Sequence, residues 1–229
     1  MATFDFKQWQ EQIIAQFSRV SGESNGIERL LTELDRLFSV TETLVQKHEE
    51  GDRSLLACKA GCQDCCVVNV SITLLEGIAI SRFIQQWGQE KRVEVEQKLD
   101  VLWCAVRGLE DDERLMLRKK CAFLDGQGCC TIYPVRPLFC RSISSTNVEA
   151  CRAAVTGTIF GDTEPVLMHQ FQLQLYKTAF SAVADGLEQA GLDGRSFQLS
   201  GLIRYLLAHP EQDEKLLVEA SLSWDDLYA

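Results

Sequence analysis

Clustered cysteines constrain this chain more than any other feature of its sequence. Ten of the 229 residues are cysteine, and four of them fall between Cys58 and Cys66. A second group in the region 121–151 consists of Cys121, Cys129, Cys130, Cys140 and Cys151. Small, buried and inert thiols are the alternative explanation, but packing alone does not require such density. The two groups therefore predict metal ligands or catalytic groups.

The start of the chain bears on whether these cysteines form disulfides. Its first residues contain no basic segment followed by an apolar stretch, so they do not resemble a secretory signal. No apolar run approaches the roughly 18 residues of a membrane span. We therefore expect a cytoplasmic protein with no membrane partner, in a compartment where thiols stay reduced.

The net charge limits the partners further. The chain carries a formal charge of −10, whereas a protein that binds duplex nucleic acid needs a surplus of Lys and Arg. We therefore expect no nucleic-acid partner. Hydrophobic residues make up 46% and charged residues 24% of the chain, which is ordinary for a globular protein, and the length suffices for one well-filled core.

Apolar residues recur every three or four positions along most of the chain, which is the pattern of amphipathic helices. Thr73 and Glu76 form a capping-box pattern, and Thr163 is expected to cap a long helix with Pro165 in its first turn. The predicted helices cover 4–20, 27 to about 51, 73–87, 90–119 with a break near Gly108, 146–155, 163–189, 197–208 and 212–222.

Residues 121–133 have a different character. The strings Cys-Ala-Phe-Leu and Cys-Cys-Thr-Ile-Tyr flank a glycine-rich turn, which predicts a short β-hairpin. We therefore expect a mainly α fold, a single-domain helical bundle over 1–229 in which two cysteine-rich loops and one short β-hairpin enclose a metal site. The cysteine cluster core should cover 55–155, with flanking helices in 1–50 and 160–229.

Thiolates are soft ligands that suit zinc, copper(I) and iron–sulfur clusters. A structural zinc takes four ligands, and a cubane cluster commonly takes four cysteines. Neighbouring side chains diverge, so Cys65 and Cys66 should serve different metals or opposite sides of one cluster. The number of candidates indicates two centres, or one centre with spare thiols. Cys104 stands alone in a predicted helix, and we interpret it as a buried, inert thiol.

Several other side chains near the cysteines are candidates for supporting roles. Cations there would stabilise thiolates or merely form a solvated basic face; they are Lys59, Arg118, Lys119, Lys120, Arg136, Arg141 and Arg152. Arg136 and Arg141 would bind an anionic substrate, steady the thiolate charge or form structural pairs. Glu76 is a candidate ligand or catalytic carboxylate that its capping box also explains. Tyr133 would hydrogen-bond a thiolate or pack beside the hairpin, and His169 is the one histidine considered as an outside ligand.

The two blocks together resemble the YkgJ-type cysteine cluster family, a zinc- or iron-chelating family named for its CxxCxxCC motif. The resemblance covers about residues 55–155, and it also includes the stretch Val-x-Ile-Thr-Leu-Leu that ends at Glu76. It rests on Cys58, Cys62, Cys65 and Cys66, then Cys121-Ala-Phe-Leu-Asp, Cys130-Thr-Ile-Tyr133, Arg136-Pro-Leu-Phe-Cys140-Arg141 and Cys151.

What the resemblance implies is metal binding rather than any particular reaction. By position it makes ligands of Cys58, Cys62, Cys65, Cys66, Cys121, Cys130, Cys140 and Cys151. Cys129 is a possible extra ligand, and the choice within the pair Cys129-Cys130 stays open. Lys59, Glu76, Tyr133, Arg136 and Arg141 would then lie around the ligands.

Three functions remain in competition. The first is a metal-binding protein whose centre is structural, storage-related or redox-active, with no known reaction. The second is an iron–sulfur enzyme that uses S-adenosylmethionine, such as a protein-lysine methylase, because the related flagellin lysine methylases look like such enzymes. The βα alternation and glycine-rich loop expected of many such enzymes are missing. The third is a structural or interaction module stapled by zinc. The dense first block slightly favours a 4Fe–4S cluster over zinc, and whether the chain is an enzyme stays open.

Overall fold

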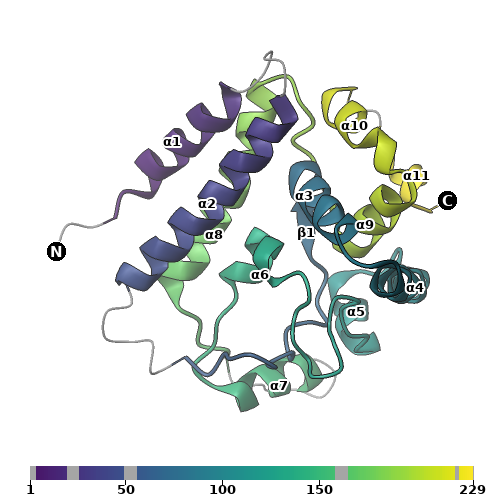
Figure 1. The fold of residues 1–229 in the computed structure, drawn as a ribbon. Helices are drawn as coiled ribbons and strands as arrows, with labels where there is room; N and C mark the ends of the chain where they lie inside the picture. Colours follow the sequence, from purple (N-terminus) through teal and green to yellow (C-terminus); the bar gives the residue numbers. More distant parts are fainter. Residues whose placement is uncertain (1–3, 20–25, 49–55, 158–164, 220–221, 229) are drawn as a thin grey trace.

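The fold is seen in a computed structural model that describes residues 4–19, 26–48, 56–157, 165–219 and 222–228. Within these ranges the chain forms eleven α-helices and one small sheet of two antiparallel strands, which confirms a mainly α fold (Figure 1). The helices are α1 (Phe6–Ser18), α2 (Gly26–His48), α3 (Leu74–Gln85), α4 (Gln89–Val106), α5 (Asp111–Leu117), α6 (Leu138–Ser142), α7 (Val148–Gly157), α8 (Gln170–Gln189), α9 (Leu199–Ala208), α10 (Asp213–Glu219) and α11 (Trp224–Tyr228). Short 3-10 helices η2 (Tyr133–Val135) and η3 (Pro210–Gln212) complete the described elements.

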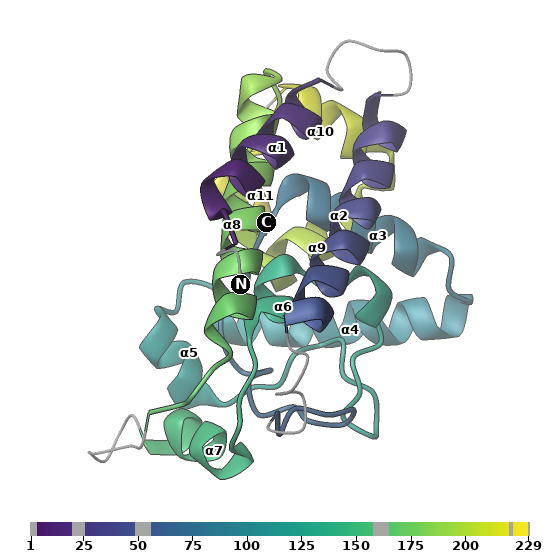
Figure 2. The ribbon, with the colours of Figure 1, turned by 90° about the vertical axis from the view of Figure 1, so that its left-hand side faces the viewer.

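Helices α1 and α8 lie side by side in both views, and α2 makes smaller contacts with each of them (Figures 1 and 2). The face of α1 that packs on α8 buries Ile13 and Phe17, one turn apart. Gly186 of α8 lets the two helices approach closely, since a Cβ there would lie 2.8 Å from Cβ of Phe17. The apolar residues that recur along α1 therefore form its buried face, as the sequence predicts.

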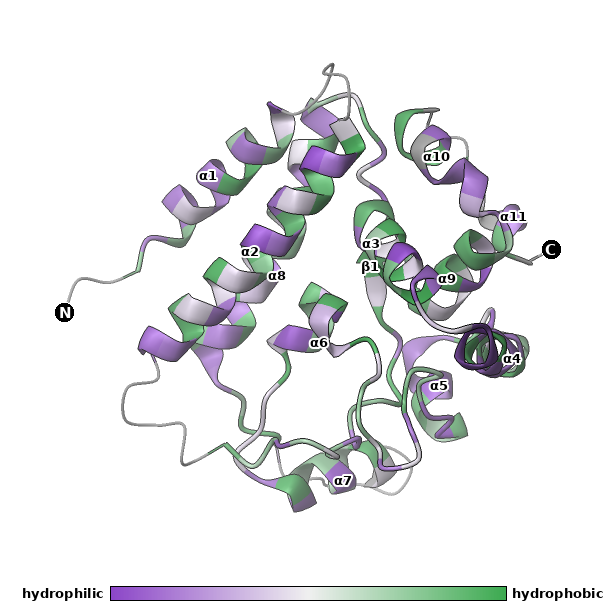
Figure 3. Cartoon of the chain, viewed as in Figure 1, coloured by the Kyte–Doolittle hydropathy of each residue, from purple (hydrophilic) through white to green (hydrophobic). Residues whose placement is uncertain are grey.

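A second group of elements is organised by the two-stranded sheet. Strand β1 (Ser71–Thr73) pairs antiparallel with β2 (Ser196–Gln198), so that Ile72 faces Phe197 across the sheet. Each strand runs directly into a helix, β1 into α3 and β2 into α9. These two helices pack on each other, and α4 packs on α9. Figure 3 shows hydrophobic residues on β1, α3 and α9 and many hydrophilic ones on α4.

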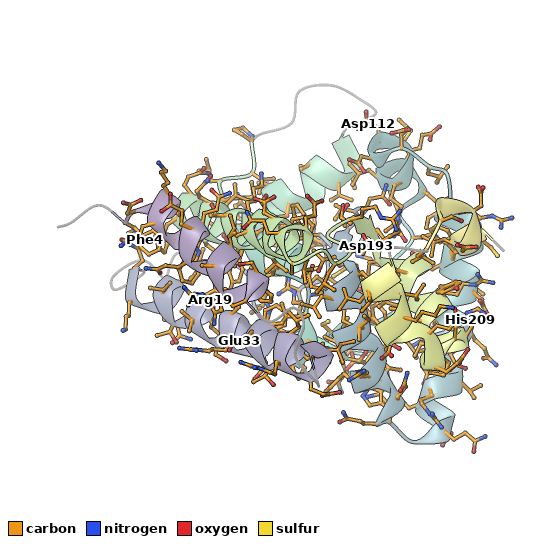
Figure 4. All side chains as sticks on the ribbon, turned by 90° about the horizontal axis from the view of Figure 1, so that it is seen from above. Phe4, Arg19, Glu33, Asp112, Asp193 and His209 are labelled. Carbon is orange, nitrogen blue, oxygen red and sulfur yellow. The ribbon has the colours of Figure 1, made fainter. Side chains whose placement is uncertain are left out.

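One continuous hydrophobic cluster joins both groups of elements. It extends from Ile13 of α1 to Leu227 of α11 and includes Ile72 and Phe197 of the sheet. Figure 4 shows side chains filling the space between the α1–α2 side, where Phe4, Arg19 and Glu33 lie, and the opposite side, where His209 lies. This continuity supports the single-domain organisation, which stays a prediction. None of the helices in the described ranges has both the length and the apolar character needed to cross a membrane.

The predicted break near Gly108 is confirmed. Helix α4 ends at Val106, Gly108 adopts a positive φ of 76°, and α5 begins at Asp111. Glycine reaches this backbone conformation at little cost, whereas a side chain would strain it.

The predicted β-hairpin over 121–133 is wrong. Only one isolated bridge forms there, between Leu124 and Cys130. The side chain of Asp125 accepts hydrogen bonds from the backbone N–H groups of Gln127 and Cys129, both at 2.8 Å, and so winds the segment into a turn. The chain then enters η2 at Tyr133, next to a proline that has no N–H to donate to a strand ladder.

The predicted start of the long helix is also wrong. Helix α8 begins at Gln170, and its cap is His169, whose Nδ1 accepts a 3.1 Å hydrogen bond from the N–H of Gln172. The N–H of Thr146 donates to the carbonyl of Leu167 at 3.2 Å, which holds that segment outside the helix. Thr163, the expected cap, lies outside the described residues.

Candidate metal centre

The first cysteine block folds as a chain of tight turns. Within residues 56–70, the N–H of Cys62 donates to the carbonyl of Lys59 at 3.0 Å, and the N–H of Cys66 donates to the carbonyl of Gln63 at 3.1 Å. Gly61 supports the first turn with a φ of 82°. These turns bring four cysteines into a short space without regular secondary structure.

The two cysteine blocks are in direct backbone contact. The N–H of Cys121 donates to the carbonyl of Cys66 at 2.8 Å. A Cβ on Gly128 would lie 2.6 Å from Nε2 of Gln63 and 3.2 Å from the carbonyl oxygen of Gly61. Gly128 also has a φ of 77°, so both its conformation and this close approach require glycine.

Further contacts tie the first block to the segment around α7. The N–H of Ala57 donates to the carbonyl of Ser145 at 2.8 Å. An ion pair joins Asp64 to Arg152 of α7, with 3.4 Å between Oδ2 and Nε. Cys151 lies on the same helix, and its charge acts on the thiol of Cys58. Both ribbon views place these loops and α7 at the end of the molecule opposite α10 (Figures 1 and 2).

Eight cysteines from both blocks line one cavity of about 480 Å³. They are Cys58, Cys62, Cys65, Cys66, Cys121, Cys129, Cys130 and Cys140. Of the two remaining cysteines, Cys151 is half-buried on α7 beside the cavity. Cys104 is exposed on α4, so its interpretation as a buried thiol is wrong; the buried face of α4 carries Leu99, Leu102 and Val106 instead.

The thiols surround the cavity rather than meet at one point. Among the described residues, no group of three or more Cys, His, Asp or Glu side chains is arranged closely enough to hold a metal ion. The expected enclosed metal site is therefore not preformed among the described residues. The chemical type of the donors nevertheless suits a metal centre, because zinc and iron–sulfur clusters prefer clustered thiolates as ligands.

Burial sets the protonation of most of these thiols. It raises the pKa of Cys121 to about 11 and that of Cys140 to about 12, because a buried thiolate loses its hydration. Burial also raises the pKa of Cys58 and Cys130. The exception is Cys65, whose pKa is lowered first by a hydrogen bond from the Cys66 thiol. That bond in turn raises the pKa of Cys66.

Arg136 is the cation at the centre of the cysteines. It lines the cavity. Burial alone would lower its pKa, but the charges of Cys140, Cys65 and Cys130 outweigh burial and leave the pKa of Arg136 raised. Its guanidinium lies where it would stabilise thiolates, which is one of the roles considered for it and stays a prediction.

The other predicted neighbours have more varied positions. Lys59 and Tyr133 line the cavity but are exposed, the tyrosine to 58%. Arg141 is not among the lining residues; it donates to the carbonyls of Pro134 at 2.8 Å and Arg136 at 2.7 Å and so braces η2. His169 is occupied as the cap of α8, which is not the ligand position considered for it.

Glu76 is a structural carboxylate rather than a cavity residue. It is 1% exposed and forms the predicted capping box with Thr73. Its other oxygen accepts a 2.9 Å hydrogen bond from the N–H of Leu138, the first residue of α6. Because α6 carries Cys140, Glu76 fixes the entry of that cysteine into the cavity.

Sequence reasoning missed Arg114. This residue of α5 is 2% exposed and lines the cavity, and its Nε and Nη1 find no hydrogen-bond partner among the described residues. In the sequence it is one of several cations that precede Cys121. Nothing in the local pattern distinguishes it from Arg118, which is exposed.

In general class this is a mostly helical protein whose two cysteine loops line one cavity with thiols of the kind that chelate metals. Residues 57–157 match the family model described as "CxxCxxCC: Putative zinc- or iron-chelating domain". This matched segment agrees closely with the expected 55–155 and confirms the resemblance seen in the sequence. In this sequence three residues, not two, separate the first two cysteines. Comparison with curated proteins and with solved structures gave no match.

Proposed function

We propose that the chain binds metal in two four-cysteine centres, preferably as iron–sulfur clusters, inside the cavity between its loops. The observation that carries this proposal is that seven of the eight proposed ligands, all except Cys151, line one cavity although they come from segments far apart in sequence. The family match supports zinc or iron as the metal. The dense spacing of the first block favours a 4Fe–4S cluster over zinc, for which separated pairs of cysteines are more usual.

The eight expected ligands make two sets of four, the number that one zinc ion or one cubane cluster takes. The charges of Cys62, Cys65 and Cys151 act on Cys58, and those of Cys121 and Cys140 act on Cys66, while that of Cys130 acts on Cys121. Cys65 also acts on Cys66 and Cys140, so the two sets would be neighbours. We therefore assign Cys58, Cys62, Cys65 and Cys151 to one centre and Cys66, Cys121, Cys130 and Cys140 to the other. This division places the neighbours Cys65 and Cys66 in different centres and leaves Cys129 as a spare thiol.

The chain itself would contribute ligands, charge compensation and shielding from water. Each buried ligand thiol must lose its proton to bind metal, so binding releases protons. Arg136 offsets part of the resulting thiolate charge. A metal centre of this kind supplies structural cross-links or one-electron redox chemistry.

A second candidate function is catalysis by the iron–sulfur centre, for example with S-adenosylmethionine as in protein-lysine methylation. The supporting observation is that the cavity also extends over apolar residues such as Leu99, Leu102 and Leu199. A purely structural zinc module would need no such space.

Anaerobic purification followed by elemental analysis tests the main proposal. Two cubane clusters predict a brown protein with about eight irons and eight sulfides per chain. A colourless protein with about two zinc ions would retain metal binding and refute the preference for iron. A protein that takes up neither metal after reconstitution would refute the function.

Single serine variants test the division into two centres. We expect Cys58→Ser and Cys121→Ser each to lose about half of the metal, because each removes a ligand from one centre only. Cys104→Ser is the matched control and should keep the full amount, since its thiol is exposed on α4. Loss of all metal in both variants would show a single shared centre.

A further inference from the structure

Arg114 is a buried cation whose charge interacts with that of Cys121 but whose guanidinium is not fully hydrogen-bonded. It is the one buried residue of α5 and is 2% exposed. Its Nε and Nη1 atoms have no hydrogen-bond partner among the described residues. An unsatisfied buried N–H costs about 1–3 kcal/mol, and more when the group is charged. Such a side chain favours a partner that the described part of the chain does not supply to these two atoms.

Among the described residues that line the cavity, no carboxylate is present to pair with Arg114. The lining consists of eight cysteines, the cations Lys59, Arg114 and Arg136, and uncharged residues. This contrasts with the chain as a whole, whose formal charge is −10. Metal-bound thiolates would make the rest of the cavity negative, so the guanidinium of Arg114 is the place at which a buried anion is favoured.

The remaining wall of the cavity is apolar. Val68, Val70, Leu99, Leu102 and Phe123 line it together with Arg114. Its volume of about 480 Å³ lies within the range of small-molecule sites, which combine mostly apolar walls with a few polar anchors. The cavity thus offers more than thiols to a bound molecule.

We propose that this cavity binds a small organic carboxylate, whose charge is held by Arg114 and whose apolar part lies against the leucines and valines. The proposal deepens the proposed function, because the ligand would share the cavity with the metal centres. It names a class of ligand that the thiols alone would not attract. Charge-assisted hydrogen bonds from a guanidinium to a carboxylate are among the stronger ones in proteins.

Binding of hexanoate to the purified, metal-loaded protein tests the proposal, with hexan-1-ol as the uncharged probe. We expect calorimetry to show hexanoate binding at least tenfold tighter than hexanol to the wild type. Arg114→Met should abolish that preference. Arg118→Met is the matched control, since it removes an exposed arginine four residues away, and it should bind as the wild type does. Equal binding of the two probes to the wild type would overturn the proposal.

Thermal unfolding separates this role from a structural one. Arg114→Met replaces an unpaired buried charge by an apolar chain of similar length, so without hexanoate the variant should melt at the same or a higher temperature. Hexanoate should raise the melting temperature of the wild type but not that of the variant. A variant that melts lower and loses metal would show that Arg114 serves Cys121 and the metal centre, which overturns the proposal.

A replacement variant and a metal-free measurement keep the test of the carboxylate site separate from folding and from metal binding. If Arg114→Met does not fold, Arg114→Lys replaces it, because lysine keeps the charge but lacks the paired N–H donors of the guanidinium. This variant should bind hexanoate more weakly than the wild type and hexanol equally well. If the wild type carries no metal, the proposed function fails, but the comparison of hexanoate with hexanol on that protein still decides the carboxylate site.

Discussion

At the scale of single residues, Glu76 links two parts of the chain that the sequence separates widely. One oxygen accepts the N–H of Thr73 at 2.9 Å and the other accepts the N–H of Leu138 at 2.9 Å. The first bond caps α3, and the second anchors α6 and with it Cys140. A carboxylate that begins one helix therefore also helps to shape the cysteine cavity.

The stability contributed by Glu76 should depend on pH. Burial raises its pKa above the usual range, although hydrogen bonds from Leu138 and Thr73 oppose this. A raised carboxyl pKa means that the folded state favours the protonated form. The contribution is therefore complete below the ordinary glutamate pKa of about 4.3 and is lost as the pH rises through the raised value.

Thermal unfolding of the wild type and Glu76→Gln across this pH range measures the effect. The variant cannot ionise at position 76, so the wild type should lose stability relative to it as the pH increases. A difference that stays constant with pH, or that changes in the opposite direction, would contradict the raised pKa of Glu76.

At the scale of elements, the packing of α1 on α8 depends on a missing side chain. A Cβ at Gly186 would lie 2.8 Å from Cβ of Phe17 and 3.1 Å from the carbonyl oxygen of Ile14. Neither of these atoms is the far end of a flexible side chain. The two helices can therefore keep their separation only with glycine at this position.

Gly186→Ala should lower the free energy of unfolding by about 1–3 kcal/mol, the usual cost of overpacking a core. Urea unfolding followed by circular dichroism measures it. Gly88→Ala is the control, because a Cβ there meets nothing within 4 Å, and as an N-cap change it should cost about 1 kcal/mol or less. Equal costs for the two variants would show that α1 does not approach α8 this closely.

At the scale of the whole molecule, the cysteine loops and the helical core have different sources of stability. The core is one hydrophobic cluster that reaches from α1 to α11. The loop 56–70 has no regular element before β1 and is held mainly by turns and by contacts with the second block. If the proposed centres are present, metal supplies the cross-links that these loops lack.

Removing the metal with a chelator under reducing conditions should therefore loosen the loops and spare the core. We expect amide exchange to increase in residues 56–70 and 120–135, whereas the helical circular dichroism signal stays largely unchanged. Residues 170–187 of α8 serve as the internal reference. Loss of the helical signal on chelation would show that the metal is required for the entire fold.

Much of the local structure was predictable from the sequence. The capping box of Thr73 and Glu76, the break near Gly108 and the helical segments are each encoded within a few neighbouring residues. The hairpin failed because one side chain, Asp125, winds the segment into a turn. The long helix starts late because the carbonyl of Leu167 accepts a hydrogen bond from the N–H of Thr146, which lies 21 positions earlier in the chain.

The sequence by itself determined the helical class, the two cysteine blocks and the family resemblance of residues 57–157, because periodicity, caps and ligand spacing are local properties. Tertiary structure alone decided that Gly61 and Gly128 bring the two blocks into contact, that Cys104 faces solvent and that Arg114 is buried in the cavity. Those facts depend on how segments tens of residues apart pack together, and no short stretch of chain encodes such packing.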